Sequence, residues 1–209
     1  RDVNVVRRDF EKERLVVGIS GASGVVDGVR LLDALAELGI ESHLVMTKAA
    51  EMTIGLETQL KPKAVAAKAD YAYAPGDIAA AIASGSFRTR GMIVAPCSVR
   101  SWSEIATGVT SNLLTRAADV TLKERRPLVL VIRETPLHSG HLRTLAELSQ
   151  MGAIILPPLP AFYSEPHRIS DFVDQIVGRA LDFFGLDWPA QKRWGEALSK
   201  GARKPQARN

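Results

Sequence analysis

Apolar and polar positions along the chain follow two alternating patterns, one typical of buried strands and one typical of helices. Largely apolar runs of strand length occupy residues 15–20, 91–95, 128–132 and 153–156, and residues 41–46 predict a further strand. Between them, apolar residues recur at helical spacing, most clearly over residues 23–38 and in the last helix, which Ser170 is expected to cap. Since wholly apolar strands are buried on both faces, this order predicts an α/β fold, with a mostly parallel sheet between two layers of helices.

Several boundaries in this pattern depend on single residues. Pro96 is expected to end the strand at 91–95. Thr135 and Pro136 are expected to open a helix that reaches about Met151, as an N-cap followed by proline at the first helical position. Further helices are expected at residues 48–57 after Thr47, at residues 112–124, and over a short stretch at residues 77–83.

The length of 209 residues and the apolar fraction of 46% suit a single α/β domain with a full core. We expect that domain at residues 14–186, with an N-terminal extension at 1–13 and a C-terminal tail at 187–209. Much of the net charge of +4 lies in these two ends, where solvated basic residues are expected rather than a nucleic-acid site. Cys97, the single cysteine, is expected to be packed in the core. One cysteine, no apolar run of membrane-spanning length and no apolar signal segment predict a cytoplasmic protein.

The turn between the first strand and the first helix, GASG at residues 21–24, is the first indication of a ligand. A strand that leads into a helix presents free N–H groups and the positive end of the helix dipole, which together bind phosphate. The glycines at 18, 21 and 24 do not have the dinucleotide spacing, and Met46-Thr47-Lys48 offers no acid for a ribose. The pattern therefore favours a mononucleotide site, while a tight turn without a ligand stays open as the alternative.

The carboxyl ends of parallel strands meet at one edge of a sheet, where such folds bind ligands. Arg133 and Glu134 directly follow a buried strand there. A guanidinium binds phosphate and a carboxylate moves protons, although a buried salt bridge between the two is the alternative. Ser98 either caps a helix or binds a ligand. The pair His138 and His141 is too small a set to indicate a metal site.

Longer stretches of the sequence resemble one known family. They are GISGASG at 18–24, HLVMTKAA at 43–50, GMIVAPCS at 91–98, LLTRAADVTLKERRPLVLVIRETPLHSGHL at 113–142 and MGAIILPPLPAFY at 151–163. Together they are similar to the UbiX-like flavin prenyltransferases, whose older name is flavoprotein aromatic-acid decarboxylases, over about residues 15–186.

The resemblance implies a single-domain, flavodoxin-like Rossmann fold, a three-layer sandwich assembled as a homododecamer with FMN bound between subunits. It implies a metal-independent prenyltransferase that joins the dimethylallyl group of dimethylallyl monophosphate to N5 and then to C6 of reduced FMN. The prenylated FMN would serve a UbiD-like decarboxylase, and a flavin reductase would supply the reduced FMN.

The resemblance also implies roles for residues at matching positions. The residues expected to bind FMN are Gly21, Ala22, Ser23, Thr47, Ser98, Val99, Arg100, Ser101 and Arg133. The residues expected to hold the prenyl phosphate are Arg116, Lys123, Tyr163 and Arg179, and the expected catalytic groups are Ser23, Glu57, Lys123 and Glu134. Three positions depart from the family pattern: Asp27, where aromatic or small residues are common, Arg100-Ser101-Trp102 in place of Lys-Thr-Leu, and Ser164-Glu165 in place of His-Arg.

Two other functions remain alternatives. A flavin-dependent decarboxylase of the cysteine or pantothenoyl-cysteine type shares the fold but carries a PxMNxxMW-like segment, which this sequence lacks. A non-enzymatic FMN carrier or accessory subunit of an aromatic-acid decarboxylase would have lost the phosphate cage, whereas all of the residues expected in that cage are present.

Overall fold

The computed structural model describes residues 13–195 and contains one sheet of six parallel strands in the order β3-β2-β1-β4-β5-β6. The strands are β1 (Arg14–Ile19), β2 (Glu41–Met46), β3 (Tyr71–Tyr73), β4 (Met92–Cys97), β5 (Leu128–Ile132) and β6 (Ile154–Ile155). The strand order reverses beside β1, so the carboxyl ends of β1 and β4 form a topological switch point. Doubly wound sheets bind their ligands at such a point.

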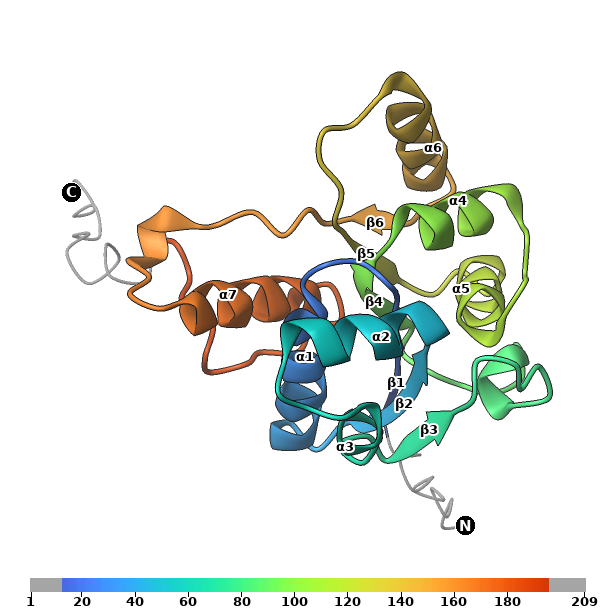
Figure 1. The fold of residues 1–209 in the computed structure, drawn as a ribbon, viewed down its shortest axis with the longest axis horizontal. Helices are drawn as coiled ribbons and strands as arrows, with labels where there is room; N and C mark the ends of the chain where they lie inside the picture. Colours follow the sequence, from blue (N-terminus) through green and yellow to red (C-terminus); the bar gives the residue numbers. More distant parts are fainter. Residues whose placement is uncertain (1–12, 196–209) are drawn as a thin grey trace, which may run out of the picture.

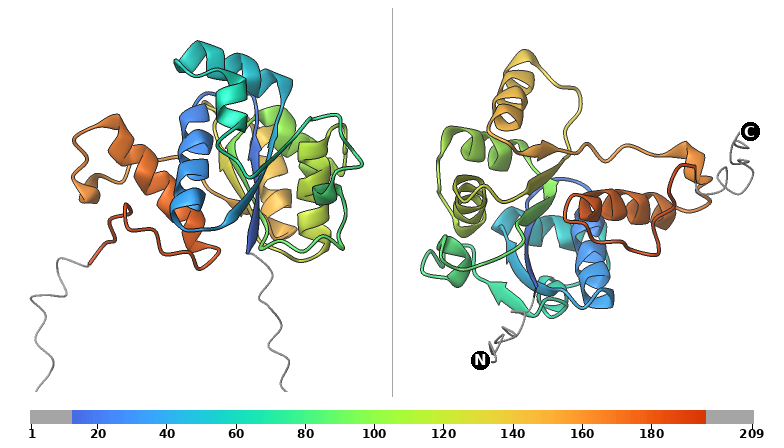
Figure 2. Two further views of the ribbon diagram at one scale, coloured as in Figure 1. Left: turned by 90° about the horizontal axis from the view of Figure 1, so that it is seen from below. Right: turned by 180° about the vertical axis from the view of Figure 1, so that it is seen from behind.

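Helices cover both faces of this sheet. They are α1 (Val25–Glu37), α2 (Lys48–Glu57), α3 (Pro62–Ala66), α4 (Val99–Thr107), α5 (Leu113–Lys123), α6 (Ser139–Gln150) and α7 (Ile169–Asp182), with 3₁₀ turns η1 (Ala81–Ala83) and η2 (Phe162–Ser164). Helices α1 and α7 lie together on one face, and α4, α5 and α6 lie on the other (Figures 1 and 2). The predicted three-layer α/β fold is confirmed, and the described sheet is wholly parallel.

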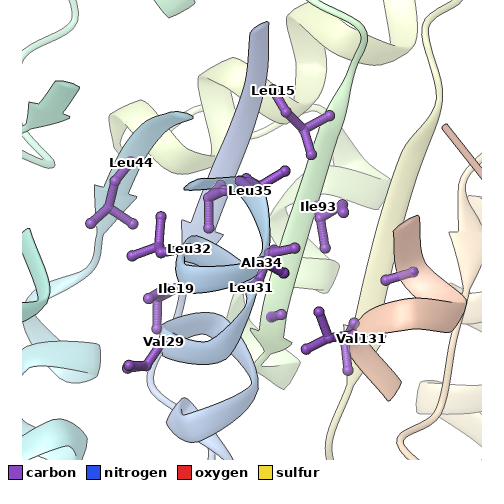
Figure 3. Packing of buried hydrophobic residues seen from close by; sticks show 14 of the residues in the cluster. Leu15, Ile19, Val29, Leu31, Leu32, Ala34, Leu35, Leu44, Ile93 and Val131 are labelled. Carbon is purple, nitrogen blue, oxygen red and sulfur yellow. The ribbon is translucent and has the colours of Figure 1, made fainter. Parts of the chain in front are cut away.

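Each face of the sheet has its own hydrophobic core, because successive strand residues point to opposite faces. Leu15 and Ile19 of β1 pack in the core under α1 and α7, whereas Val16 packs in the core under α4 and α5. Figure 3 shows the first core, where Leu32 and Leu35 of α1 lie against the sheet. Burial of a leucine side chain contributes about 1.5–3 kcal/mol relative to an exposed one, so this packing holds α1 against the sheet.

Strand β4 continues through Pro96, so the prediction that Pro96 ends it is wrong. The register with β5 shifts between Val94 and Cys97, and the strand therefore passes Pro96 through an irregularity of the bulge type. The carbonyl of Pro96 accepts hydrogen bonds from the N–H of Ser20 at 3.2 Å and from its hydroxyl at 2.8 Å. Cys97 remains in the strand and is wholly buried, which confirms its predicted packing role.

Helix α6 begins later than the sequence predicts. His138 Nδ1 accepts hydrogen bonds from the N–H groups of Gly140 at 3.1 Å and His141 at 3.3 Å, which makes His138 the N-cap. Thr135 and Pro136, the expected start, are joined by a cis peptide in the preceding loop. The prediction of an N-cap at Thr135 is therefore wrong.

Three other elements differ from the expected pattern. Helix α7 begins at Ile169 after Arg168, which places Ser170 inside the helix rather than at its cap. Of the short helix expected at 77–83, only η1 is helical. Strand β3 is not revealed by the sequence, because three residues are too few to show an alternating pattern.

The packed part of the chain extends beyond residue 186, where the sequence places the end of the domain. Trp188 is 1% exposed, and its indole N–H donates to Glu37 at 2.7 Å. The guanidinium of Arg30 lies over the Trp188 ring, 4.8 Å from its centroid. Trp188 therefore packs on α1, and Gln191 and Arg193 donate to Asp182 of α7 at 3.1 and 2.7 Å. Residues 1–12 of the expected extension and 196–209 of the expected tail lie outside the described residues.

Candidate functional site

A cavity of about 600 Å³ opens at the carboxyl edge of the sheet, beside the switch point of β1 and β4. Cavities of this volume hold cofactors and other small organic ligands. The residues that line it are Gly21, Ala22, Ser23, Thr47, Lys48, Ala49, Pro75, Gly76, Ser98, Val99, Arg100, Ser101, Glu104, Ser111, Asn112, Arg133 and Glu134. All the residues that the resemblance assigns to FMN are among them, together with two of the expected catalytic groups, Ser23 and Glu134.

Three helices direct their N-termini toward this cavity. Thr47 caps α2 by accepting the N–H of Ala50 at 3.1 Å, and Ser98 caps α4 by accepting the N–H of Ser101 at 3.4 Å. Asn112, which also lines the cavity, is the N-cap of the third helix, α5. The remaining N–H groups of each first turn have no partner within their helix, and with the helix dipoles they favour an anion. Ser98 therefore caps a helix and also lines the ligand cavity.

The succession of strand, turn and helix predicts that the N-terminus of α1 binds a phosphate. In the structure, a carboxylate of the chain occupies that position instead. The N–H groups of Gly24 and Val25 donate to Glu57 Oε2 at 2.9 and 3.3 Å, and the Ser23 hydroxyl is bonded to the same carboxylate. Burial opposes ionisation of Glu57, but these donors and the charge of Arg133 outweigh it and hold the pKa of Glu57 below its usual value. An ionised Glu57 therefore takes the place of an external anion at α1.

Glu104 lines the cavity from α4, although the sequence pattern does not single it out. Its carboxylate accepts hydrogen bonds from Arg100 Nε at 2.8 Å and from the Ser111 hydroxyl at 2.6 Å. Burial opposes ionisation of Glu104, but the bonds from Ser111 and Arg100 outweigh it, so its pKa lies below the usual value. Glu104 thereby pairs with the exposed Arg100 guanidinium at the edge of the cavity. The spacing of four residues within a helix is the signal that could have identified this pair.

Arg133 and Glu134 follow β5, and both are exposed at the cavity. Glu134 Oε1 accepts a hydrogen bond from the N–H of Thr135 at 2.9 Å, and within residues 13–195 no ion pair joins it to Arg133. The alternative of a buried salt bridge between the two is therefore wrong. The guanidinium of Arg133 and the carboxylate of Glu134 are therefore both available to a ligand in the cavity.

A second, smaller pocket of about 240 Å³ lies beyond β6 on the side of α7. Tyr163 from η2 and Arg179 from α7 line it among apolar residues. Gln175 Nε2 donates to the Tyr163 hydroxyl at 2.9 Å, and Arg179 Nη1 pairs with Asp182 at 2.7 Å. Two of the residues expected at the prenyl phosphate therefore share one pocket.

The other two cations expected at the prenyl phosphate, Arg116 and Lys123, lie on α5. This helix covers the opposite face of the sheet from α7 (Figure 2). Arg116 Nη1 pairs with Asp119 at 2.7 Å, and Lys123 Nζ pairs with Glu124 at 2.6 Å. One chain does not bring these cations to the pocket on α7, so a phosphate site that uses all four residues requires a second copy.

The histidine pair of α6 is explained by local structure. The rings of His138 and His141 stack with their centroids 3.6 Å apart, where His138 caps the helix. Within residues 13–195, no three or more His, Cys, Asp or Glu side chains are grouped so that they could hold a metal ion. In the same part of the chain, no helix has both the length and the apolar character needed to cross a membrane.

Comparison with known proteins agrees with this geometry. A family model described as Flavoprotein matches residues 4–180. Flavin prenyltransferase UbiX of Escherichia coli K12 is 52% identical over 185 residues, which cover 87% of this chain and 98% of that protein. The crystal structure of AnUbiX (PadA1) in complex with FMN and dimethylallyl pyrophosphate matches with a TM-score of 0.87 and 50% identity, over 88% of this chain and 98% of that one.

A second solved structure shows the same likeness. The dodecameric FMN-dependent UbiX-like decarboxylase from Escherichia coli O157:H7 has a TM-score of 0.85 and 51% identity, over 87% of this chain and 98% of that one. These matches extend over most of both chains in each comparison. The chain therefore belongs to the UbiX-like flavin prenyltransferases, within the flavoprotein family.

Proposed function

We propose that this chain transfers the dimethylallyl group of dimethylallyl monophosphate to reduced FMN, with new bonds at N5 and C6 of the flavin. The observation that carries the proposal is the presence of two sites at one edge of the sheet. One is the large cavity with hydroxyls and helix N-termini, and the other is the smaller pocket with Tyr163 and Arg179. A relative that is 50% identical is described in complex with both FMN and a dimethylallyl donor.

The large cavity suits FMN in size and in chemistry. The first turns of α2 and α4, with the hydroxyls of Thr47, Ser98 and Ser101, would hold the phosphate and ribityl portions. Arg133 and Ser23 would meet the ring system at the other side of the cavity. Reduced FMN, when bound, supplies the nucleophilic nitrogen and carbon that protein side chains lack.

The loop after β1 passes so close to α2 that residue 21 must be glycine. A Cβ atom at Gly21 would lie 2.3 Å from the Cβ of Ala49 in the first turn of α2. Since real Cβ atoms do not approach so closely, a side chain at Gly21 would push these two walls of the cavity apart. Glycine at position 21 therefore lets the turn after β1 and the first turn of α2 adjoin as two walls of the cavity.

The small pocket suits the prenyl donor. As the bond between the donor carbon and the phosphate oxygen breaks, negative charge grows on the phosphate. A guanidinium and a phenol at Arg179 and Tyr163 stabilise that charge more strongly than they stabilise the bound donor. The apolar lining, which includes Leu156, Pro157 and Ile176, would keep water from the allyl group.

We also propose a homo-oligomer, with twelve copies as in the dodecameric relative. In this arrangement Arg116 and Lys123 of one copy would complete the phosphate site of its neighbour. The support is their position on α5, away from the pocket on α7. Their present pairs with Asp119 and Glu124 are at the surface, where ion pairs contribute little and are readily exchanged.

Closure of the new ring would add C6 to the carbon–carbon double bond of the prenyl group, whose other carbon takes up a proton, and C6 then loses its own proton. The cavity provides carboxylates that could handle these protons. Glu134 is exposed in the cavity, and the Ser23 hydroxyl is bonded to the ionised Glu57. The departing phosphate, or Glu134 through Ser23, would accept the proton from C6. Glu57 would orient the Ser23 hydroxyl during this transfer.

The proposed activity is tested by turnover with limiting enzyme. With excess reduced FMN and dimethylallyl monophosphate, we expect many equivalents of inorganic phosphate per subunit, matched by loss of unmodified flavin. An FMN carrier would bind flavin but release no phosphate. Phosphate release no faster than in an enzyme-free control would contradict the proposed activity.

Replacement of Glu134 by glutamine is expected to leave FMN affinity unchanged and to slow product formation by about 10²-fold, because the amide cannot accept the proton. Flavin fluorescence quenching measures the affinity, and phosphate release measures the rate. Glu147→Gln, at an exposed position of α6, is the matched control. An unchanged rate for Glu134→Gln would remove this carboxylate from the chemistry.

The product itself indicates the partners. We propose that the prenylated FMN passes to a UbiD-like decarboxylase as its cofactor, and that a flavin reductase supplies the reduced FMN. A cytoplasmic location belongs to the same proposal, and the single buried thiol of Cys97 supports it.

A further inference from the structure

Asp27 is an acidic residue in the apolar interface between α1 and the sheet. It is only 5% exposed, although it lies in the first turn of α1, four residues after Ser23. It borders a small cavity that is too narrow to admit water. The other residues around this cavity are all apolar: Leu31, Ile93, Ala95, Val131, Ile176, Val177 and Ala180. Figure 3 shows three of them, Leu31, Ile93 and Val131, in the packing between α1 and the sheet.

The carboxyl group of Asp27 has no hydrogen bond and no ion pair with any residue of the described range 13–195. Its one charged neighbour is Glu57, and both carboxyl groups approach Gly24. The Gly24 N–H donates to Glu57 Oε2, and a Cβ atom at Gly24 would lie 3.4 Å from Asp27 Oδ2. Burial is the larger cause, and the negative charge of Glu57 the smaller one, that together raise the pKa of Asp27 to about 7. Below about pH 7, Asp27 is therefore mostly protonated whereas Glu57 is ionised.

No cation on the surrounding elements compensates Asp27. Strands β4 and β5 present apolar side chains to it, and Arg133, which follows β5, acts on Glu57. The other acidic and basic side chains of α1 and α7 are held in ion pairs: Arg30 with Asp174 and Glu37, Asp33 with Lys68, Arg168 with Asp171, and Arg179 with Asp182. Of the charged groups of α2, Lys48, Glu51 and Glu57, only Glu57 acts on Asp27.

We propose that Asp27 is a positioning residue for the Ser23–Glu57 pair. When it carries a proton, its neutral side chain lets the first turn of α1 stay packed on the sheet, and Glu57 keeps its bonds to the turn. When it loses the proton, an unpaired charge appears in an apolar site beside a second carboxylate. The turn at residues 23–25 must then move away from the sheet toward water, which displaces Ser23 from the cavity wall.

The proposal rests on the proposed function only for its consequence in catalysis, so its test begins with binding. We expect FMN affinity of the wild-type protein to fall several-fold as the pH rises from about 7 to 9, with a slope of at most tenfold per pH unit for one proton. Asp27→Asn is neutral at every pH and of the same size. Throughout this pH range, the FMN affinity of Asp27→Asn should stay at the value that the wild-type protein has at pH 6. Asp33→Asn, on the same helix but at its surface, should follow the wild-type profile.

A spectroscopic measurement on the protein without FMN detects the proton directly. At about pH 6 the wild-type infrared spectrum should contain a carbonyl band of a protonated carboxyl group that Asp27→Asn lacks. Glu57→Gln removes the neighbouring charge, so the same band should disappear at a lower pH than in the wild type. This second variant decides the question if Asp27→Asn does not fold.

Two results would overturn the proposal. One is superimposable affinity profiles for the wild type and Asp27→Asn, and the other is a protonated-carboxyl band that is unaffected by either variant. Neither result depends on prenyl transfer. Failure of the proposed function would instead appear as a wild-type protein that binds FMN with the predicted pH profile but forms no product at any pH.

Discussion

Replacement of Arg179 by methionine is expected to lower kcat/KM for dimethylallyl monophosphate by about 10²–10³-fold. Methionine keeps the aliphatic part of the side chain but removes the positive charge from the pocket that also contains Tyr163. Because charge on the phosphate grows as its bond to carbon breaks, kcat should fall more than KM rises. Steady-state phosphate release measures both constants, and FMN affinity should not change.

The control for this experiment is Arg143→Met, at an exposed position of α6 on the other face of the sheet. It removes the same charge from the chain without touching either pocket. Equal kinetics for the two variants would mean that the pocket on α7 does not bind the donor phosphate.

The same variant tests whether two copies build one phosphate site. Lys123→Met should also lower kcat/KM strongly, although Lys123 lies on α5 across the sheet from α7. If the two residues act in one site from different copies, mixed oligomers of Arg179→Met and Lys123→Met regain activity, because some sites receive an intact residue from each. Random mixing of equal amounts would restore about one quarter of the sites. No recovery after verified subunit exchange would place both residues in the same copy or remove Lys123 from the site.

Replacement of Gly28 by alanine is expected to destabilise the fold by about 3 kcal/mol. In a helix interior, alanine is ordinarily better than glycine by about 1 kcal/mol. At Gly28 the sign reverses, because the new Cβ atom would lie 2.2 Å from the carbonyl oxygen of Ala95 and 2.8 Å from the Ile19 side chain. Helix α1 must then move away from β4, and the turn at residues 21–24 moves with it.

Gly55→Ala is the matched control for the Gly28 variant. Gly55 is also inside a helix, α2, but a Cβ atom there would have no neighbour within 4 Å. This variant should therefore be as stable as the wild type or slightly more stable. Thermal and denaturant unfolding, followed by far-UV circular dichroism, measure both effects. Equal stability of the two variants would contradict the close contact between α1 and the sheet.

The sheet could be predicted because most of its strands are buried on both faces. The apolar run at residues 128–132 coincides with β5, and residues 41–46 coincide with β2. The start of α6 could not be predicted in this way, because its cap is a histidine ring rather than one of the usual capping side chains. Strand β3 is recognisable only by its pairing with β2, which is a contact between distant residues.

Some features of the candidate site could likewise be predicted from local sequence, and others depend on contacts between distant residues. Residues such as Ser98 and Arg133 follow strands directly, so the topology of a parallel sheet collects them at one edge without any further information. The anion at the N-terminus of α1 could not be foreseen, because it is a carboxylate 33 residues away at the end of α2. The burial of Asp27 also depends on the packing of α7 over α1, which no local pattern reveals.

The mass of the flavin after reaction decides whether this chain joins a prenyl group to FMN. The purified protein is mixed with reduced FMN and dimethylallyl monophosphate under strictly anaerobic conditions, and the flavin is extracted and analysed by mass spectrometry. We expect a flavin heavier than FMN by one prenyl unit, formed in excess over the protein and absent when the donor is omitted. Recovery of unmodified FMN alone, under conditions in which the E. coli relative converts its flavin, would contradict the proposed prenyl transfer.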